Sequence, residues 1–163
     1  MRRIIGRLIA SAAAGVIATG TMSIAMGLFK LGGFLGEPPP VKLTRRILGP
    51  LGVNRSRPRT LALATIASHL GYGTAVAMLH ELVPGRSSAA KGTAFGLAVW
   101  GVSYGGWIPK LGLMPRPALD RPGRPTSMIL AHLVYGATLG FVRSRLGWGE
   151  STLRAQGQFP HTT

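Results

Sequence analysis

Two histidine–tyrosine pairs stand inside long stretches of the chain that contain no charged residue. The segments His69-Leu70-Gly71-Tyr72-Gly73 and His132-Leu133-Val134-Tyr135-Gly136 share the pattern His-Leu-x-Tyr-Gly. A separation of three residues places the imidazole and the phenol on one face of a helix. An imidazole can ligate a haem iron, relay a proton, or hydrogen-bond a hydroxyl or carbonyl group. His69, Tyr72, His132 and Tyr135 therefore form the candidate polar intramembrane site.

Three interpretations of this site are open. An ionisable side chain within a bilayer is by default a functional-site hypothesis. The first interpretation is structural: each histidine hydrogen-bonds a facing helix, an interaction that contributes about 0.6 kcal/mol on average. The second is axial ligation of a haem by His69 and His132, and the third is a proton- or small-solute-conducting path. We favour the structural interpretation, which needs no cofactor and no metal.

The few acidic residues argue against catalysis. Glu37, Glu81, Asp120 and Glu150 are the four acids, all outside the charge-free stretches, and the chain has no cysteine. Carboxylate-pair hydrolysis, thiolate chemistry and cysteine-ligated metal sites are therefore excluded. The sequence also lacks His-Glu-x-x-His and phosphate-loop motifs. We expect a structural or accessory protein rather than an enzyme.

Four charge-free windows provide the elements that would position these side chains. They run over residues 8–29, 60–80, 92–109 and 125–142. A helix of about 20 apolar residues spans a bilayer, and only structures that satisfy their own backbone hydrogen bonds can do so. The 19 Lys and Arg residues all lie outside these windows and so avoid the roughly 2.5–3.5 kcal/mol that each would cost at a helix centre. The sequence predicts an all-α integral membrane protein: one domain with four transmembrane helices.

The partner expected from this charge pattern is the lipid bilayer. A nucleic-acid-binding domain would instead gather its cations in a stripe on a folded surface. Within the 41–59 link, Lys42, Arg45 and Arg46 alternate with apolar residues in a short amphipathic segment, which predicts contact with anionic lipids at the interface. Nucleic acid is not an expected partner.

The windows also form a duplication. Lys30-Leu31-Gly32 closes the first window and Lys110-Leu111-Gly112 closes the third. A proline-rich link follows each of them, and then a helix with His-Leu-x-Tyr-Gly. Two crossings per unit insert both copies in the same direction, which predicts two parallel two-helix repeats with His69 and His132 at similar depth.

Arginines at the beginning of the chain indicate its orientation. Arg2, Arg3 and Arg7 lie next to the first window. Positive residues favour the cytoplasmic side, so we expect cytoplasmic N- and C-termini in a multi-pass protein of the bacterial inner membrane.

Small residues predict close helix packing. The pairs Gly92 and Gly96, Gly101 and Gly105, and Gly136 and Gly140 have the Gly-x-x-x-Gly spacing. Lipid provides no hydrophobic drive for helix association, so helices meet where small residues let their backbones approach. We expect packing within one bundle, with a homo-oligomer interface as the alternative.

Several motifs together resemble a known group. They are Glu37-Pro38-Pro39-Pro40, the His-Leu-x-Tyr-Gly helices and the segment from Trp100 to Pro115, which contains Trp107-Ile108-Pro109-Lys110. This arrangement resembles the YagU-like uncharacterised proteins of bacterial inner membranes over roughly residues 8–145. The resemblance implies a four-helix inner-membrane protein with a link to acid tolerance. It implies no active-site residues.

Overall fold

The computed structural model describes residues 2–50 and 58–156, and within these ranges all regular structure is helical. Three helices are long: α1 (Arg2–Leu31), α3 (Pro58–Leu79) and α6 (Arg124–Gln156). They supply three stretches that are long and apolar enough to cross a membrane, namely Ile4–Leu31, Pro58–Leu82 and Arg124–Leu146. The prediction of an all-α chain is confirmed. These stretches extend beyond the windows 8–29, 60–80 and 125–142 because the helical backbone continues into the charged flanks.

The remaining window, 92–109, is helical but not uniform. The chain runs without a break through α4 (Ala89–Val102), the π-helical turn η2 (Ser103–Trp107) and the single turn α5 (Ile108–Lys110). The Ser88 hydroxyl accepts a hydrogen bond from the Lys91 amide and so caps the start of α4. Pro109 lacks an N–H, and in a regular α-helix its ring would clash with the carbonyl four residues earlier. The wider turn of η2 ends two residues before Pro109 and accommodates it.

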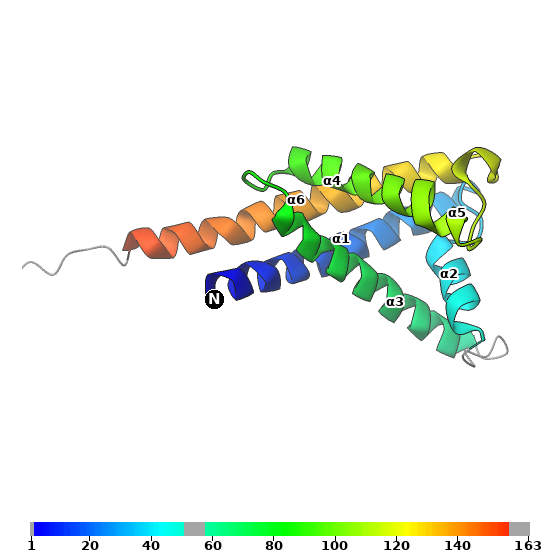
Figure 1. The fold of residues 1–163 in the computed structure, drawn as a ribbon, viewed down its shortest axis with the longest axis horizontal. Helices are drawn as coiled ribbons and strands as arrows, with labels where there is room; N and C mark the ends of the chain where they lie inside the picture. Colours follow the sequence, from blue (N-terminus) through cyan, green and yellow to red (C-terminus); the bar gives the residue numbers. More distant parts are fainter. Residues whose placement is uncertain (1, 51–57, 157–163) are drawn as a thin grey trace, which may run out of the picture.

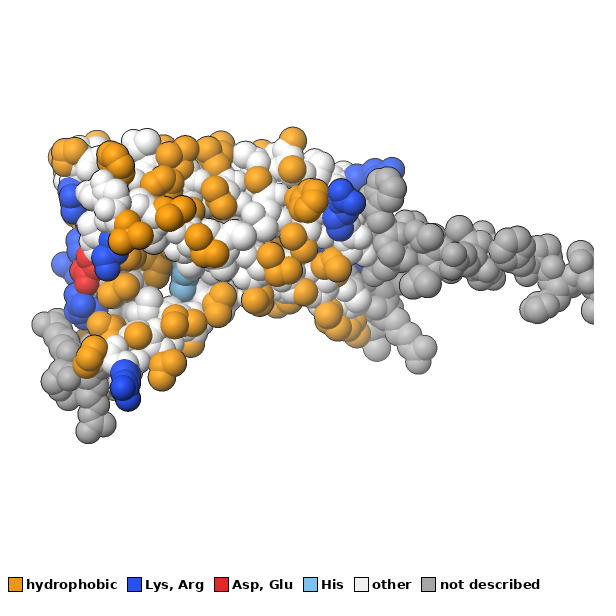
Figure 2. All heavy atoms as spheres, turned by 180° about the vertical axis from the view of Figure 1, so that it is seen from behind, with side chains coloured by type: hydrophobic (Ala, Val, Ile, Leu, Met, Phe, Trp, Pro, Cys, Tyr) orange, Lys and Arg blue, Asp and Glu red, His pale blue; other side chains and the backbone are white. Residues whose placement is uncertain are grey.

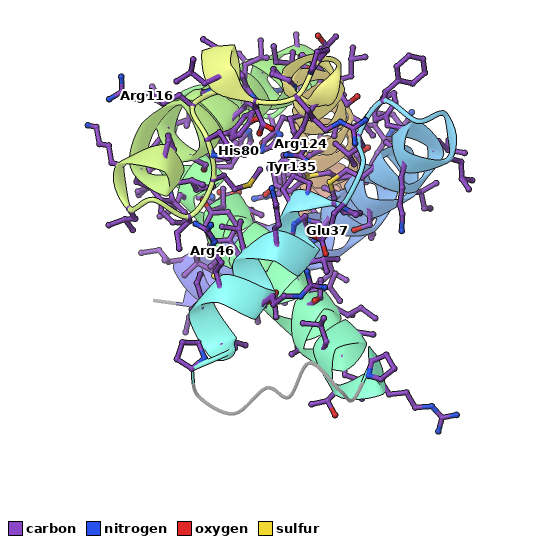
Figure 3. All side chains as sticks on the ribbon, turned by 90° about the vertical axis from the view of Figure 1, so that its right-hand side faces the viewer. Glu37, Arg46, His80, Arg116, Arg124 and Tyr135 are labelled. Atoms are coloured by element: carbon purple, nitrogen blue, oxygen red, sulfur yellow. The ribbon has the colours of Figure 1, made fainter. Side chains whose placement is uncertain are left out.

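The long helices form an open arc rather than a closed ring. α4 packs along α6, α6 along α1, and α1 along α3 (Figure 1). α3 diverges from the other helices toward its N-terminal end, and α2 (Pro39–Leu48) lies in the resulting wedge and contacts α3 (Figures 1 and 3). The start of α1 and the last turns of α6 lie at one end of the molecule. We call that end the terminal face, and the end with links 32–38 and 111–123 the link face.

Glycines bring α4 and α6 together. Gly92 and Gly96 on α4 face Gly136 and Gly140 on α6, and a Cβ added at any of the four would collide with backbone atoms of the opposite helix. Two of the three Gly-x-x-x-Gly pairs therefore form a helix contact within the chain. A Cβ at Gly101 or Gly105 would meet open space, and self-association through these two residues stays a prediction.

A buried polar cluster joins the two links. Arg124 at the start of α6 pairs with Asp120 at 2.7 Å and donates from Nε to the Leu35 carbonyl at 3.1 Å. Tyr104 of η2 donates its hydroxyl proton to the other oxygen of Asp120. Asp120 follows the short 3-10 turn η3 (Pro117–Leu119). The cluster fixes the links and the start of α6 against η2.

Candidate functional site

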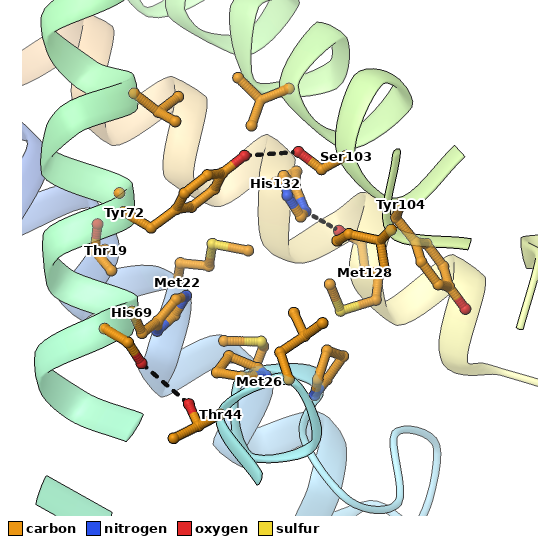
Figure 4. Close-up of a pocket in the computed structure, with 18 of the residues that line it drawn as sticks. Thr19, Met22, Met26, Thr44, His69, Tyr72, Ser103, Tyr104, Met128 and His132 are labelled. Atoms are coloured by element: carbon orange, nitrogen blue, oxygen red, sulfur yellow. Dashed lines mark hydrogen bonds between the residues drawn. The ribbon is translucent and has the colours of Figure 1, made fainter. Parts of the chain in front are cut away.

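An apolar cavity of about 230 Å³ occupies the wedge between α3 and the other helices (Figure 4). Four methionines line it, together with all three tyrosines of the chain, Trp107 and two histidines, His69 and His132. No charged side chain of the described residues lines it. The methionines are Met22, Met26, Met114 and Met128. The methionine side chain is flexible, which suits a cavity wall that packs against ligands of different shapes.

The structure places His132 on the α6 wall of this cavity. Its Nδ1 lies 2.8 Å from the Met128 carbonyl oxygen, one turn earlier in the same helix. A carbonyl oxygen can only accept, so Nδ1 carries the proton and Nε2 of the neutral ring keeps its lone pair. The side chain is 7% exposed.

His69 has the same tautomer for a different reason. Its Nδ1 lies 3.2 Å from the Ser23 hydroxyl oxygen on α1. The Ser23 hydroxyl donates its proton to the Thr19 carbonyl at 2.8 Å. That proton is therefore unavailable, so His69 Nδ1 donates to Ser23 and Nε2 carries the lone pair.

The two tyrosines connect helices across the wedge. Tyr135 of α6 donates its hydroxyl proton to the Gly73 carbonyl of α3 at 2.7 Å. The Tyr72 hydroxyl of α3 lies 2.9 Å from the Ser103 hydroxyl in η2, and its ring lies 6.4 Å from that of Trp107. The four candidate residues thus surround one cavity, although neither histidine hydrogen-bonds the tyrosine of its own motif.

α2 covers this cavity on the link side. Leu43, Ile47 and Leu48 line it, and the Thr44 hydroxyl lies 3.0 Å from that of Ser68 on α3. Two of the α2 cations bind within the chain: Arg45 pairs with Glu37 at 2.6 Å, and Arg46 donates to the Gly112 carbonyl. The expected amphipathic segment is therefore a helix whose apolar side faces the interior. Of the 41–59 link, residues 51–57 lie outside the described residues, and anionic-lipid contact there stays a prediction.

A second polar cluster lies at the terminal face, and the sequence interpretation missed it. Glu81 accepts from Arg143 Nε at 2.6 Å, from Arg7 Nε at 2.8 Å and from the Ser11 hydroxyl. The Arg143 and Glu81 side chains are 7% and 10% exposed. The sequence did contain one indication of this cluster: arginines greatly outnumber the four acids, so each acid is expected to pair with an arginine. Glu37, Glu81 and Asp120 all pair with arginine in the part of the chain that the structure describes.

The described residues contain no group of three or more His, Cys, Asp or Glu side chains arranged to hold a metal ion. The lining side chains of the apolar cavity that could ligate a metal are instead the two imidazoles, of His69 and His132, and the methionine thioethers. A histidine that ligates a metal donates its other ring N–H to a neighbouring oxygen. His69 and His132 both show that second interaction.

The fold and the site define a class of protein: a helical chain with membrane-length apolar helices and a partly open cavity lined by thioether, aromatic and imidazole groups. The chain matches the family of unknown function DUF6789 over residues 5–153 and belongs to that family. No curated protein and no solved structure matches it. The resemblance to the YagU-like group stays a prediction.

Proposed function

We propose that this chain is a non-enzymatic accessory protein of the bacterial inner membrane that holds one small lipid-soluble molecule in its apolar cavity. The observation that carries the proposal is the cavity of about 230 Å³ in the wedge. Protein interiors are close-packed, with few voids larger than a water molecule. An apolar cavity of about 150 Å³ stays free of water and binds benzene. A cavity of this size and lining is suited to an apolar molecule of one or two rings, or to part of a lipid chain.

The proposal includes four membrane crossings. Residues 89–110 run without a break through α4, η2 and α5, which at about 1.5 Å per residue approaches the thickness of the hydrocarbon core. The repeat units are then α1 with α3, and α4–α5 with α6. Their two His-Leu-x-Tyr-Gly motifs meet at one cavity, which supports a parallel duplication. Arginines at the terminal face support cytoplasmic termini.

The two histidines define the polar requirement for the occupant. Nε2 of His69 and of His132 carries a lone pair, because each Nδ1 proton is already donated. An occupant with a hydroxyl or N–H group would donate to one of these acceptors. The proposed ligand therefore has an apolar body and one hydrogen-bond donor.

Equilibrium dialysis of the full chain in detergent tests this proposal with two probes, naphthalene and 2-naphthol. We expect both to bind with one-to-one stoichiometry and 2-naphthol to bind more tightly, by about the 0.5–1.5 kcal/mol of one hydrogen bond. Leu43→Trp places an indole ring in the cavity and should abolish binding of both. Leu63→Trp is the matched control, since Leu63 is 68% exposed on the outer side of α3. Equal uptake by these two variants would mean that the probes dissolve in detergent and the cavity binds nothing.

Haem binding is the second candidate function, and the paired Nε2 lone pairs favour it. The volume opposes it, because pockets for drug-sized ligands measure about 300–1,000 Å³ and a porphyrin would require α2 to move away. An optical spectrum decides: a Soret band that shifts on dithionite reduction, and is absent from His69→Ala and His132→Ala, would replace the apolar-ligand proposal.

Conduction of protons or small solutes requires polar groups in series along a path. The cavity that holds the two histidines is lined mainly by thioether, aliphatic and aromatic groups. We therefore expect proteoliposomes to show no proton flux that depends on His69 and His132. Flux that is lost in the double alanine variant would establish the conduction hypothesis instead.

A further inference from the structure

We propose that a second cavity, at the terminal face, is a binding site for a phosphate group. This polar cavity measures about 200 Å³ and lies between the end of α3, the loop 83–88, the start of α4 and the later part of α6. Its charged or ionisable lining residues are Arg7, His80, Glu81, Arg86, Lys91 and Arg143. It is separate from the apolar cavity, and the two share no lining residue.

The charges around the polar cavity do not balance. Four cations, Arg7, Arg86, Lys91 and Arg143, face one carboxylate, Glu81, which leaves a formal charge of three positive units. Both Glu81 oxygens already accept hydrogen bonds from Arg7, Arg143 and Ser11. Arg86 is exposed and makes no ion pair with any described residue. An anion that enters the cavity therefore finds unneutralised positive charge.

His80 provides the second, independent observation. Its side chain is fully buried, and neither ring nitrogen has a hydrogen-bond partner among the described residues. The ring packs edge-on against Phe95 at 5.3 Å between centroids, and it lines the polar cavity. Buried polar side chains almost always have a partner, and an orphaned one is available to bind a water molecule or an ion. A ring N–H of His80 that faces the cavity would donate to an anion oxygen.

Hydrogen bonds of Lys91 order the polar cavity before any ligand binds. Its ammonium group donates to the carbonyl oxygens of Val83 and Gly85, at 2.7 and 2.8 Å, and so holds the loop against the start of α4. The third ammonium proton remains for a ligand. The first turn of α4 also points its positive helix-dipole end toward this side.

These features select a phosphate group over a carboxylate. A guanidinium fork pairs with two phosphate oxygens at once, and a phosphate has further oxygens for Lys91 and His80. The same chemistry occurs in an anionic phospholipid headgroup and in free phosphate. The cavity lies at an end of the membrane-length helices, where headgroups would be found.

The experiment uses the purified full chain in a neutral detergent, with binding measured by native mass spectrometry. One arm titrates phosphatidylglycerol against phosphatidylcholine, and the other titrates inorganic phosphate. We expect one saturable site, with phosphatidylglycerol bound at least about tenfold more tightly than phosphatidylcholine. Arg86→Gln and His80→Phe should each weaken that binding about tenfold. Arg116→Gln is the control, because it removes one exposed cation at the link face and should change nothing.

The two arms distinguish the source of the phosphate. Saturable binding in the lipid arm alone identifies a headgroup site, and binding in both arms identifies a general phosphate site. Absence of saturable binding in both arms overturns the proposal. Equal weakening by Arg86→Gln and Arg116→Gln also overturns it, because net charge would then account for the effect. Arg86 is exposed, so its variant keeps the fold even if His80→Phe does not.

Discussion

The apolar cavity and the polar cavity have nearly equal volumes, about 230 and 200 Å³, and opposite linings. The apolar cavity lies at the wedge among thioether, methyl and aromatic groups, with two polar bridges across it. The polar cavity lies at the terminal face among arginines and a lysine. One fold therefore holds a site that depends on packing (Figure 4) and a site that depends on charge. On the face drawn in Figure 2, hydrophobic side chains cover the long helices, and the Lys and Arg side chains lie toward the ends of the molecule. Substitutions and salt should affect the two sites differently.

Removing the carboxylate at the polar cavity should have the largest effect on stability. Glu81→Ala leaves Arg143 buried without its partner, and breaking a buried ion pair costs about 3–5 kcal/mol. Arg7 adds little to this figure because its side chain is 55% exposed. Unfolding in mixed micelles with increasing SDS measures the free energy of unfolding.

The matched control is Glu37→Ala, which breaks a pair whose side chains are 35% and 36% exposed. The free energy of unfolding should fall by about 0–1 kcal/mol in this variant. Equal losses in the two variants would show that the polar cavity is no more protected from solvent than the link face.

Adding one methyl group to the glycine contact between α4 and α6 should have the next largest effect on stability. In Gly136→Ala the new Cβ meets the Gly92 carbonyl and the Thr93 backbone, so α4 must shift away from α6. Overpacking of this kind costs about 1–3 kcal/mol. Because Lys91 lies beside Gly92, the variant should also disturb the polar cavity. Thermal unfolding in detergent measures the loss.

Gly101→Ala is the control for the glycine contact between α4 and α6, because its Cβ would meet open space. It should leave stability unchanged or raise it by less than about 1 kcal/mol, the difference between alanine and glycine in helices. A destabilised Gly101→Ala variant would show that this face also packs against something, such as a second copy of the chain.

Salt should separate the two cavities without any substitution. The Debye length falls from about 10 Å at 0.1 M ionic strength to about 3 Å at 1 M. We expect phosphatidylglycerol binding to weaken severalfold over that range, whereas 2-naphthol binding stays the same or strengthens slightly. Phosphatidylglycerol binding is measured by native mass spectrometry and 2-naphthol binding by equilibrium dialysis, and equal salt sensitivity of the two ligands would contradict the assignment of one ligand to each cavity.

Loss of a single hydroxyl in the apolar cavity should have the smallest effect on stability. Tyr135→Phe removes the hydrogen bond to the Gly73 carbonyl, which lies on α3 across the wedge. Hydrogen bonds between membrane helices average about 0.6 kcal/mol. Tyr72→Phe is the companion variant, since it removes the bridge to Ser103. A loss near that of Glu81→Ala would mean that the wedge is held by polar contacts after all.

The sequence predicted the long helices because membrane length and absence of charge are properties of a single segment. It also selected His69 and His132 because an ionisable side chain stands out within an apolar stretch. Their meeting at one cavity depends on how α3 diverges from the other helices, and no local pattern carries that information. The tautomers depend on Ser23 and Thr19 of another helix, which the spacing within the motif could not indicate.

The polar cavity could not be predicted for a related reason. Arg7, Glu81 and Arg143 are separated by 74 and 62 positions, and each alone is typical of a helix end. His80 and Glu81 are neighbours in the sequence. In the structure the neighbours point to different partners: Glu81 binds arginines, whereas His80 is buried against Phe95.

The turn η2 also affects how relatives of this chain can be compared. A π turn holds one residue more than the α-helical turn it replaces, so it rotates everything after it by about 100° about the helix axis. Before the turn, Gly92 and Gly96 face α6; within and after it, Ser103, Trp107 and Ile108 face the wedge. A homologue that lacks one residue between 103 and 107 would turn the counterparts of Trp107 and Ile108 away from the wedge. In such a protein, residues that are identical in an ungapped alignment would face a different side of the helix and line the cavity differently.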